Sequence, residues 1–286
     1  MRRRPSRSLR SRLLRRRGLV LGALLTLAVL ACAGLSVLWT PWPPFDIDVD
    51  HKLLTPSLDH WLGTDALGRD VLSLLLVGAQ SAISVGLVAV GLGLLAGTAL
   101  GLLAAARRGW LEQLIMRVAD FGQAFPAILT AIMITAVDGP AMANAMLAIG
   151  IYNIPVFARI TRASAQGVWT RDYVLAARAN GYGAWRITWM HVLPNIAAVL
   201  VVQATVQFAL AILAEAALSY LGLGAQAPET SWGRMLNDAQ TLLFQAPMLA
   251  VYPGVAIAIA VLGLNLLGDG LRDLLDPKLR TGQRAP

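Results

Sequence analysis

The chain is poor in charged residues and nearly devoid of lysine and cysteine. Only 14% of its 286 residues are charged, where an average soluble protein has about a quarter, and 57% are hydrophobic. Its single cysteine, Cys32, excludes an intrachain disulfide. Its two lysines, Lys52 and Lys278, belong to no G-x-x-x-x-G-K-[ST] loop, so the chain has no P-loop with which to hold ATP. This composition predicts an all-α protein that crosses a membrane several times.

The motifs of catalysis and of metal binding are missing as well. There is no G-x-S-x-G, no H-E-x-x-H and no cysteine cluster. His51 and His60 share a loop, but a pair without a third ligand is weak support for a metal site. Only Glu215 and, at an edge, Asp120 are charged within the apolar runs, whereas an ion-driven carrier usually has several such groups. We expect a non-enzymatic chain with no catalytic or metal-binding residues, no cofactor of its own and an external energy source.

Six apolar runs, each near the ~20 residues that a spanning helix needs, divide the chain. The first follows an arginine-rich start, a layout that a cleaved signal peptide shares. Because this run continues past Cys32 and further runs follow, an uncleaved helix is favoured. The predicted parts are an Arg-rich leader (1–17), a first transmembrane helix (18–40), a hydrophilic loop (41–80), a core with five more transmembrane helices (81–268) that includes a polar loop (159–195), and a tail (269–286).

The distribution of positive charge predicts the orientation. Six spans place both termini on one side, together with residues 107–118 and 159–195, and this side then holds 21 of the 24 lysines and arginines. Because positive residues are retained in the cytoplasm, we expect the termini and loop 159–195 to be cytoplasmic and loop 41–80 to be extracytoplasmic. The asymmetry also accounts for the net charge of +8 without any nucleic-acid partner.

Within the polar loop, the stretch Tyr173–Asn195 reads as a short helix, a glycine-broken turn and a second short helix that stops at Pro194. Small residues fall on one predicted helix face and would permit close approach of another chain, while large aromatic residues around them are typical interface anchors. An ordinary positively charged loop between two spans is the alternative. The small residues are Ala176, Ala177, Asn180 and Gly181, and the aromatic ones are Tyr173, Tyr182, Trp185 and Trp189.

Two features of the spans carry further expectations. The spacing Gly93-x3-Gly97-x3-Gly101 suits close packing of two membrane helices. A carboxylate at membrane depth is costly, so Glu215 either serves translocation or is a buried structural hydrogen-bonding group, and the structural role is favoured.

Several strings resemble bacterial ABC-importer permeases. The A-A pair, Gly181 and H-V-L-P-N at His191–Asn195 resemble the cytoplasmic "EAA" loop of this family, although Leu175 stands where the motif has Glu. W-L-G-T-D-A-L-G-R-D at Trp61–Asp70 is similar to the signature of the dipeptide, oligopeptide and nickel branch. The resemblance implies a type I importer permease fold with six transmembrane helices in the bacterial inner membrane. It also implies that the ATPase-coupling residues are Tyr173, Ala176, Ala177, Gly181, His191, Leu193 and Pro194.

The same resemblance implies a set of partners. These are a second permease subunit, two cytoplasmic ATPase subunits that use ATP–Mg, and an extracytoplasmic solute-binding protein. The implied cargo is a dipeptide or oligopeptide, with nickel or a metal chelate as the alternative within the family. An ion-coupled secondary carrier remains a second, less favoured class.

Overall fold

The computed structural model describes residues 9–275, which form helices and loops without a β-strand element. Residues 1–8 of the predicted leader and 276–286 of the predicted tail lie outside the described part of the chain. The helices are α1 (Leu9–Leu38), α2 (Val71–Ala106), α3 (Trp110–Ala124), α4 (Ala127–Asp138), α5 (Met142–Trp169), α6 (Asp172–Ala179), α7 (Ala184–Ile187), α8 (Leu193–Tyr220), α9 (Trp232–Ala239) and α10 (Met248–Leu275). Short 3-10 turns at Val49–His51 and Gln240–Leu242 and a π-helical turn at Thr188–Val192 complete the set.

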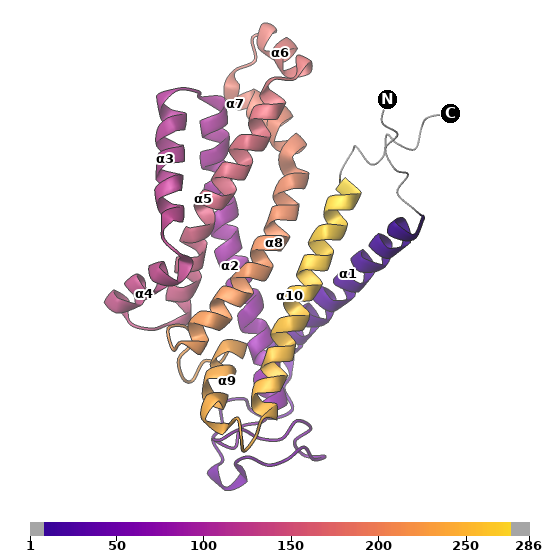
Figure 1. Ribbon diagram of the computed structural model, residues 1–286, viewed down its shortest axis with the longest axis vertical. Helices are drawn as coiled ribbons and strands as arrows, with labels where there is room; N and C mark the ends of the chain where they lie inside the picture. The colour runs from indigo at the N-terminus through magenta and orange to yellow at the C-terminus, as the bar shows by residue number, and fades with distance from the viewer. Residues whose placement is uncertain (1–8, 276–286) are drawn as a thin grey trace.

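Helices α2, α5, α8 and α10 run roughly along the long axis of the molecule, and a fifth long helix, α1, lies obliquely beside α10 (Figure 1). Each is long and apolar enough to cross a membrane, and the bent pair α3–α4 makes a sixth crossing if it counts as one span. The segment α6–α7 lies at one end, and the first described turn of α1 and the last turn of α10 point toward that end (Figure 1). The 39–70 loop and α9 lie at the opposite end, as six alternating crossings require. The predicted all-α membrane fold is therefore confirmed, with five spans, or six where α3 and α4 together count as one.

The tightest packing in the bundle joins α2 to α5 through the predicted glycine spacing. A methyl group added at Gly93 would lie 2.4 Å from Asn153 Cβ, and one at Gly97 would lie 2.4 Å from the Ile154 carbonyl oxygen. Gly101 meets the Ala158 carbonyl oxygen in the same way, at 2.5 Å. Because glycine has no side chain, the α2 backbone approaches α5 closely over about two helical turns, as small-residue spacings allow in membrane helices.

Two predicted boundaries were wrong by more than two helical turns. Helix α2 begins at Val71, not after Gln80, because Asp70 caps its first turn by accepting from the Ser73 N–H at 2.8 Å. Helix α5 continues past residue 158 to Trp169. Arginines do not end it, because carboxylates on α3 pair with them: Arg159 with Asp120, and Arg162 with Glu112, whose Oε1 lies 2.8 Å from the arginine Nε.

Helices α3 and α4 do not form one straight helix. Helices α3 and α4 meet at 81°, and the break falls at Phe125 and Pro126. A proline lacks the N–H that would continue the helical ladder, and it disfavours helical geometry in the residue before it. Phe125 accordingly adopts an extended conformation with ψ 124°. Pro126 thus turns α4 almost perpendicular to α3.

The 39–70 loop is folded by its own polar side chains. Asp65 accepts from the N–H groups of Leu67 and Arg69 and from the Arg69 guanidinium, and His60 Nδ1 lies 3.0 Å from Asp70 Oδ1. His51 Nδ1 lies 2.8 Å from Asp48 Oδ2; this hydrogen bond raises the pKa of His51 and lowers the pKa of Asp48. Each histidine thus has a separate carboxylate partner. Within residues 9–275 no three such groups gather as a metal site.

Candidate coupling site

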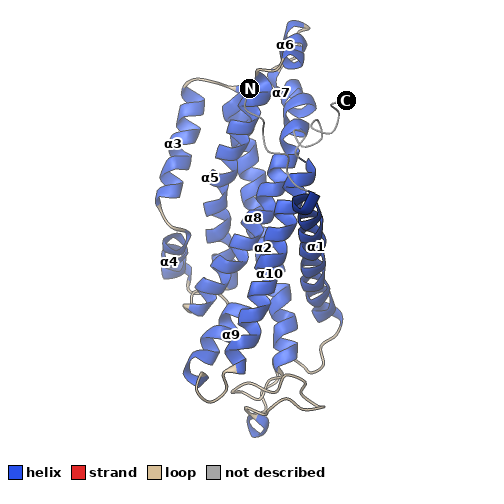
Figure 2. Cartoon of the chain, turned by 45° about the vertical axis from the view of Figure 1, so that its right-hand side comes forward, coloured by secondary structure: helices blue, strands red, loops and turns tan. Residues whose placement is uncertain are grey.

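The predicted coupling stretch projects from one end of the bundle. Helix α6 stands beyond the ends of α5 and α8 in both views (Figures 1 and 2). Its sequence alternates between inward anchors and outward residues. Val174 and Ala177 are buried with Trp169, Ile187 and Val192 in one apolar cluster, whereas residues 175, 176 and 178–186 are exposed. Through this cluster α6 packs against Trp169 at the end of α5 and against Ile187 and Val192 of α7 and the π-helical turn.

This burial corrects the predicted face of small residues. Ala176 and Ala177 are neighbours in sequence, and successive helical residues point about 100° apart, so they cannot both face a partner. Ala176 is exposed, while Ala177 keeps only 8% of its surface and faces its own chain. The exposed small residues are therefore Ala176, Asn180 and Gly181, and the Asn180 side-chain amide donates to the Ala176 carbonyl at 3.0 Å.

Gly181 ends α6 in a left-handed turn with φ +81°. Its N–H donates to the Arg178 carbonyl at 2.9 Å, and the Tyr182 N–H donates to the Ala177 carbonyl at 3.1 Å. These two bonds form a Schellman motif, in which glycine is favoured because it has no Cβ. An added Cβ would meet no atom of this chain within 4 Å, so Gly181 lies against open space. The geometry thus requires glycine for the backbone and leaves its surface free.

Aromatic and cationic contacts stiffen the stretch. The Tyr173 ring meets the His191 ring edge-on at 6.0 Å between centroids, which ties α6 to the π-helical turn. The Arg178 guanidinium lies 5.9 Å from the Trp169 ring and that of Arg186 lies 4.2 Å from the Tyr182 ring, both within cation–π range. His191 therefore packs locally against Tyr173.

Pro194 does not stop the second short helix, contrary to the prediction. Residues Ala184–Tyr220 form one continuous helical span, with a π-helical turn at Thr188–Val192 directly before the proline. In that turn the Leu193 N–H donates to the Thr188 carbonyl, five residues back. Pro194 has no N–H to donate to the carbonyl four residues back, and the wider π-helical turn lets the helix continue without that hydrogen bond. Leu193 and Pro194 thus join the coupling stretch to α8 without a flexible break.

Glu215 lies at the other end of α8 and is buried to 1% exposure. Its Oε1 accepts from the Ser219 hydroxyl at 2.7 Å, and Ser231 also hydrogen-bonds to it. Ser219 in turn accepts from the Ala225 N–H at 3.0 Å. The carboxylate is thus enclosed where α8 meets the start of α9, remote from α6. This geometry supports the structural alternative for Glu215.

Sequence reasoning missed the residues that hold the stretch in place. Val174 and Trp169 are the buried anchors, and neither was singled out. The i, i+3 spacing of Val174 and Ala177 is the helical spacing of one face and could have revealed them. Nothing in the residue pattern marks the π-helical turn beyond Pro194 itself.

The described helices define a class of protein, a multi-pass membrane protein with a short helix that projects from one end of an apolar bundle. Comparison with known proteins agrees with this class. Residues 97–281 match the family described as "Binding-protein-dependent transport system inner membrane component", and the chain belongs to this family. It is thus a multi-pass inner-membrane protein of a transport system, as predicted, and its fold is that of the type I ABC importer permeases.

Individual relatives cover almost the whole chain. The dipeptide transport system permease protein DppC of Alkalihalophilus pseudofirmus is 41% identical over 262 residues, which are 92% of this chain and 86% of the relative. The glutathione transport system permease protein GsiD of Pectobacterium atrosepticum is 41% identical over 282 residues, 97% of this chain and 92% of the relative. GsiD of Escherichia coli is 42% identical over 270 residues, which are 93% of this chain and 88% of the relative. The predicted ABC-importer permease family is confirmed.

Proposed function

We propose that this chain is the permease subunit of an ATP-driven importer of short peptides, with α6 as the helix that docks on an ATPase subunit. The single observation that carries the coupling role is the geometry of α6. It is anchored through Val174 and Ala177, exposed at Ala176 and Gly181, and projects beyond the bundle. Both substrates named for the relatives, dipeptide and glutathione, are short peptides, which supports a peptide over a nickel chelate.

The orientation follows from the charges around α6. The turn after α2 has Arg107 and Arg108, and the segment around α6 and α7 adds Arg171, Arg178 and Arg186. Among residues 9–275, the opposite end has only Lys52, Arg69 and Arg234. Positive residues stay in the cytoplasm, so the α6 end is cytoplasmic and the 39–70 loop faces a solute-binding protein. A second permease subunit and two ATPase subunits complete the importer, and ATP–Mg is held by the ATPases.

The contacts of α6 suggest how force reaches the spans. Helix α6 is attached to α5 through the apolar cluster and to α8 through the Tyr173–His191 contact and the unbroken helix Ala184–Tyr220. If ATP-driven closure of the ATPases moves α6, the displacement passes to both helices, because none of these joints is a flexible loop. ATP must change the contacts that α6 makes in the two states, since a partner with equal contacts would shift nothing. The spans then alternate between outward and inward access.

Cysteine cross-linking tests the assignment. In a Cys32→Ser background, Ala176→Cys places a thiol on the exposed face of α6, and Leu58→Cys places one on the opposite loop, where Leu58 is 95% exposed. We expect a membrane-impermeant maleimide to label position 58 in intact spheroplasts and position 176 only in inverted vesicles. Position 176 should cross-link to the ATPase subunit and position 58 should not.

Two results would overturn the proposal. Labelling of position 176 from outside would reverse the orientation, and absence of any cross-link from it would remove α6 as the docking helix. Uptake of a radiolabelled dipeptide into proteoliposomes of the whole complex gives the second readout. Uptake that continues without ATP and collapses with an ion gradient would instead assign a secondary carrier.

A further inference from the structure

An apolar groove lies directly beneath the coupling stretch. It encloses about 740 Å³ between α2, α7, the π-helical turn and α8, with Leu264 of α10 at its far end. Apart from one arginine and three threonines, every residue that lines it is apolar. The hydroxyls of Thr188 and Thr205 donate to the carbonyls of Ala184 and Val202, both at 2.8 Å, whereas the buried Thr98 hydroxyl has no hydrogen-bond partner within the described residues. One free hydroxyl between apolar walls cannot satisfy the backbone polar groups of a peptide, so the groove is better suited to a hydrocarbon chain.

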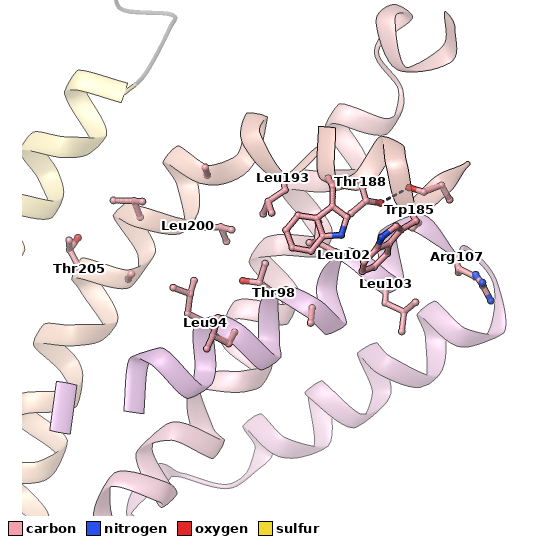
Figure 3. A pocket seen from close by; sticks show the side chains of 18 of the residues that line it. Leu94, Thr98, Leu102, Leu103, Arg107, Trp185, Thr188, Leu193, Leu200 and Thr205 are labelled. Atoms are coloured by element: carbon pink, nitrogen blue, oxygen red, sulfur yellow. Dashed lines mark hydrogen bonds between the residues drawn. The ribbon is translucent and has the colours of Figure 1, made fainter. Parts of the chain in front are cut away.

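The one charged group stands at the rim. Arg107 caps the end of α2 with its side chain exposed and lies beside Trp185 at the mouth of the groove (Figure 3). Trp185 and Trp189 are 75% and 51% exposed, and their rings meet edge-on at 5.6 Å. Exposed tryptophans beside an arginine are typical of the membrane–water interface, where their rings lie at the level of the head groups. The mouth thus lies at the depth of lipid phosphates.

The length of the groove also fits one leaflet. Its lining runs along α2 from Arg107 to Leu94, thirteen residues apart. At 1.5 Å per residue this is about 20 Å along the helix axis. One leaflet contributes about 15 Å to a hydrocarbon core of ~30 Å. A single acyl chain that enters beside Arg107 would therefore be accommodated over its whole depth.

We propose that this groove binds one acyl chain of an anionic phospholipid, whose phosphate pairs with Arg107. The charge complementarity at the rim selects an anionic head group, and the apolar walls take the chain. Because Trp185, Thr188 and Trp189 form one wall, the bound lipid supports the coupling stretch from below. This site is independent of the transported substrate and depends only on insertion of the chain in a membrane.

Native mass spectrometry of the full importer complex tests the site. The probe is phosphatidylglycerol in nanodiscs that otherwise contain phosphatidylcholine. Ala197→Phe adds a ring at an exposed position of the groove wall, and Val199→Phe adds the same ring to α8 outside the lining. Arg107→Ala removes the rim charge, and Arg108→Ala removes the adjacent exposed charge outside the lining.

We expect wild type and both controls, V199F and R108A, to retain phosphatidylglycerol. A197F should lose the retained lipid. R107A should lower the preference for phosphatidylglycerol over phosphatidylcholine about fivefold, the effect of about 1 kcal/mol that one basic residue contributes near an anionic surface. Equal retention in A197F and wild type would overturn the proposal. A disulfide between Ala197→Cys and the partner permease would also overturn it, because a protein helix would then fill the groove.

Discussion

Replacement of Gly181 separates the two demands that the structure places on this residue. Its φ of +81° costs a residue with a Cβ about 1–2 kcal/mol, and asparagine bears this conformation better than other residues. An energy of that size lowers the population of the native turn about 5–30-fold. No atom of the chain lies within 4 Å of the added Cβ, so steric strain inside this subunit adds nothing. Gly181→Ala and Gly181→Val therefore loosen the turn, whereas Gly181→Asn preserves it.

Uptake by the asparagine variant isolates the docking surface. If an ATPase subunit approaches Gly181 closely, the Asn side chain overpacks that contact, and overpacking costs about 1–3 kcal/mol. We expect G181N to resist proteolysis of the 170–190 segment as well as wild type does, yet to lose about tenfold in ATP-dependent dipeptide uptake. Gly183→Asn is the matched control, because Gly183 is exposed with open space around it and has φ −68°, which any residue adopts.

Full uptake by G181N, with loss confined to G181A and G181V, would refute the reasoning. Gly181 would then be required only for the Schellman turn, and the ATPase would have to dock elsewhere. A loss in G183N equal to that in G181N would also count against the docking surface. It would show that the whole loop is sensitive to substitution.

Three further predictions follow from single contacts. Gly97→Ala should lower the melting temperature of the purified complex, because its Cβ would lie 2.4 Å from a carbonyl oxygen of α5. The loss of stability should be about 1–3 kcal/mol. Gly91→Ala, whose Cβ would meet nothing within 4 Å, should not lower it. Asp48→Asn should return the raised pKa of His51 toward its ordinary value, as NMR titration of the ring would show, and an unchanged pKa would disprove the pair. Leu175→Glu should leave dipeptide uptake equal or higher, since Leu175 is 49% exposed, and a severe loss would indicate a different docking mode.

The sequence by itself determined the class of the protein and the order of its parts. Apolar runs longer than about twenty residues have no other stable place than a membrane, so composition settles the fold class without tertiary information. The Gly93–Gly97–Gly101 spacing identified the helix face that packs closely, because residues without bulky side chains let a neighbouring backbone approach. A helix cap at Asp70 and a helix break at Pro126 are effects of residue type that are local to the backbone.

The tertiary structure alone decided which residues of the coupling stretch face outward. Ala176 and Ala177 are equivalent in composition and adjacent in sequence, yet one is exposed and the other is buried against Trp169 and Val174. The continuation of α5 past Arg159 depends on carboxylates of α3 nearly forty residues away in sequence, which no local pattern indicates. The groove beneath α7 likewise exists only because α2 and α8 meet there. Contacts between distant segments set these features, and their energies do not appear in any single stretch of sequence.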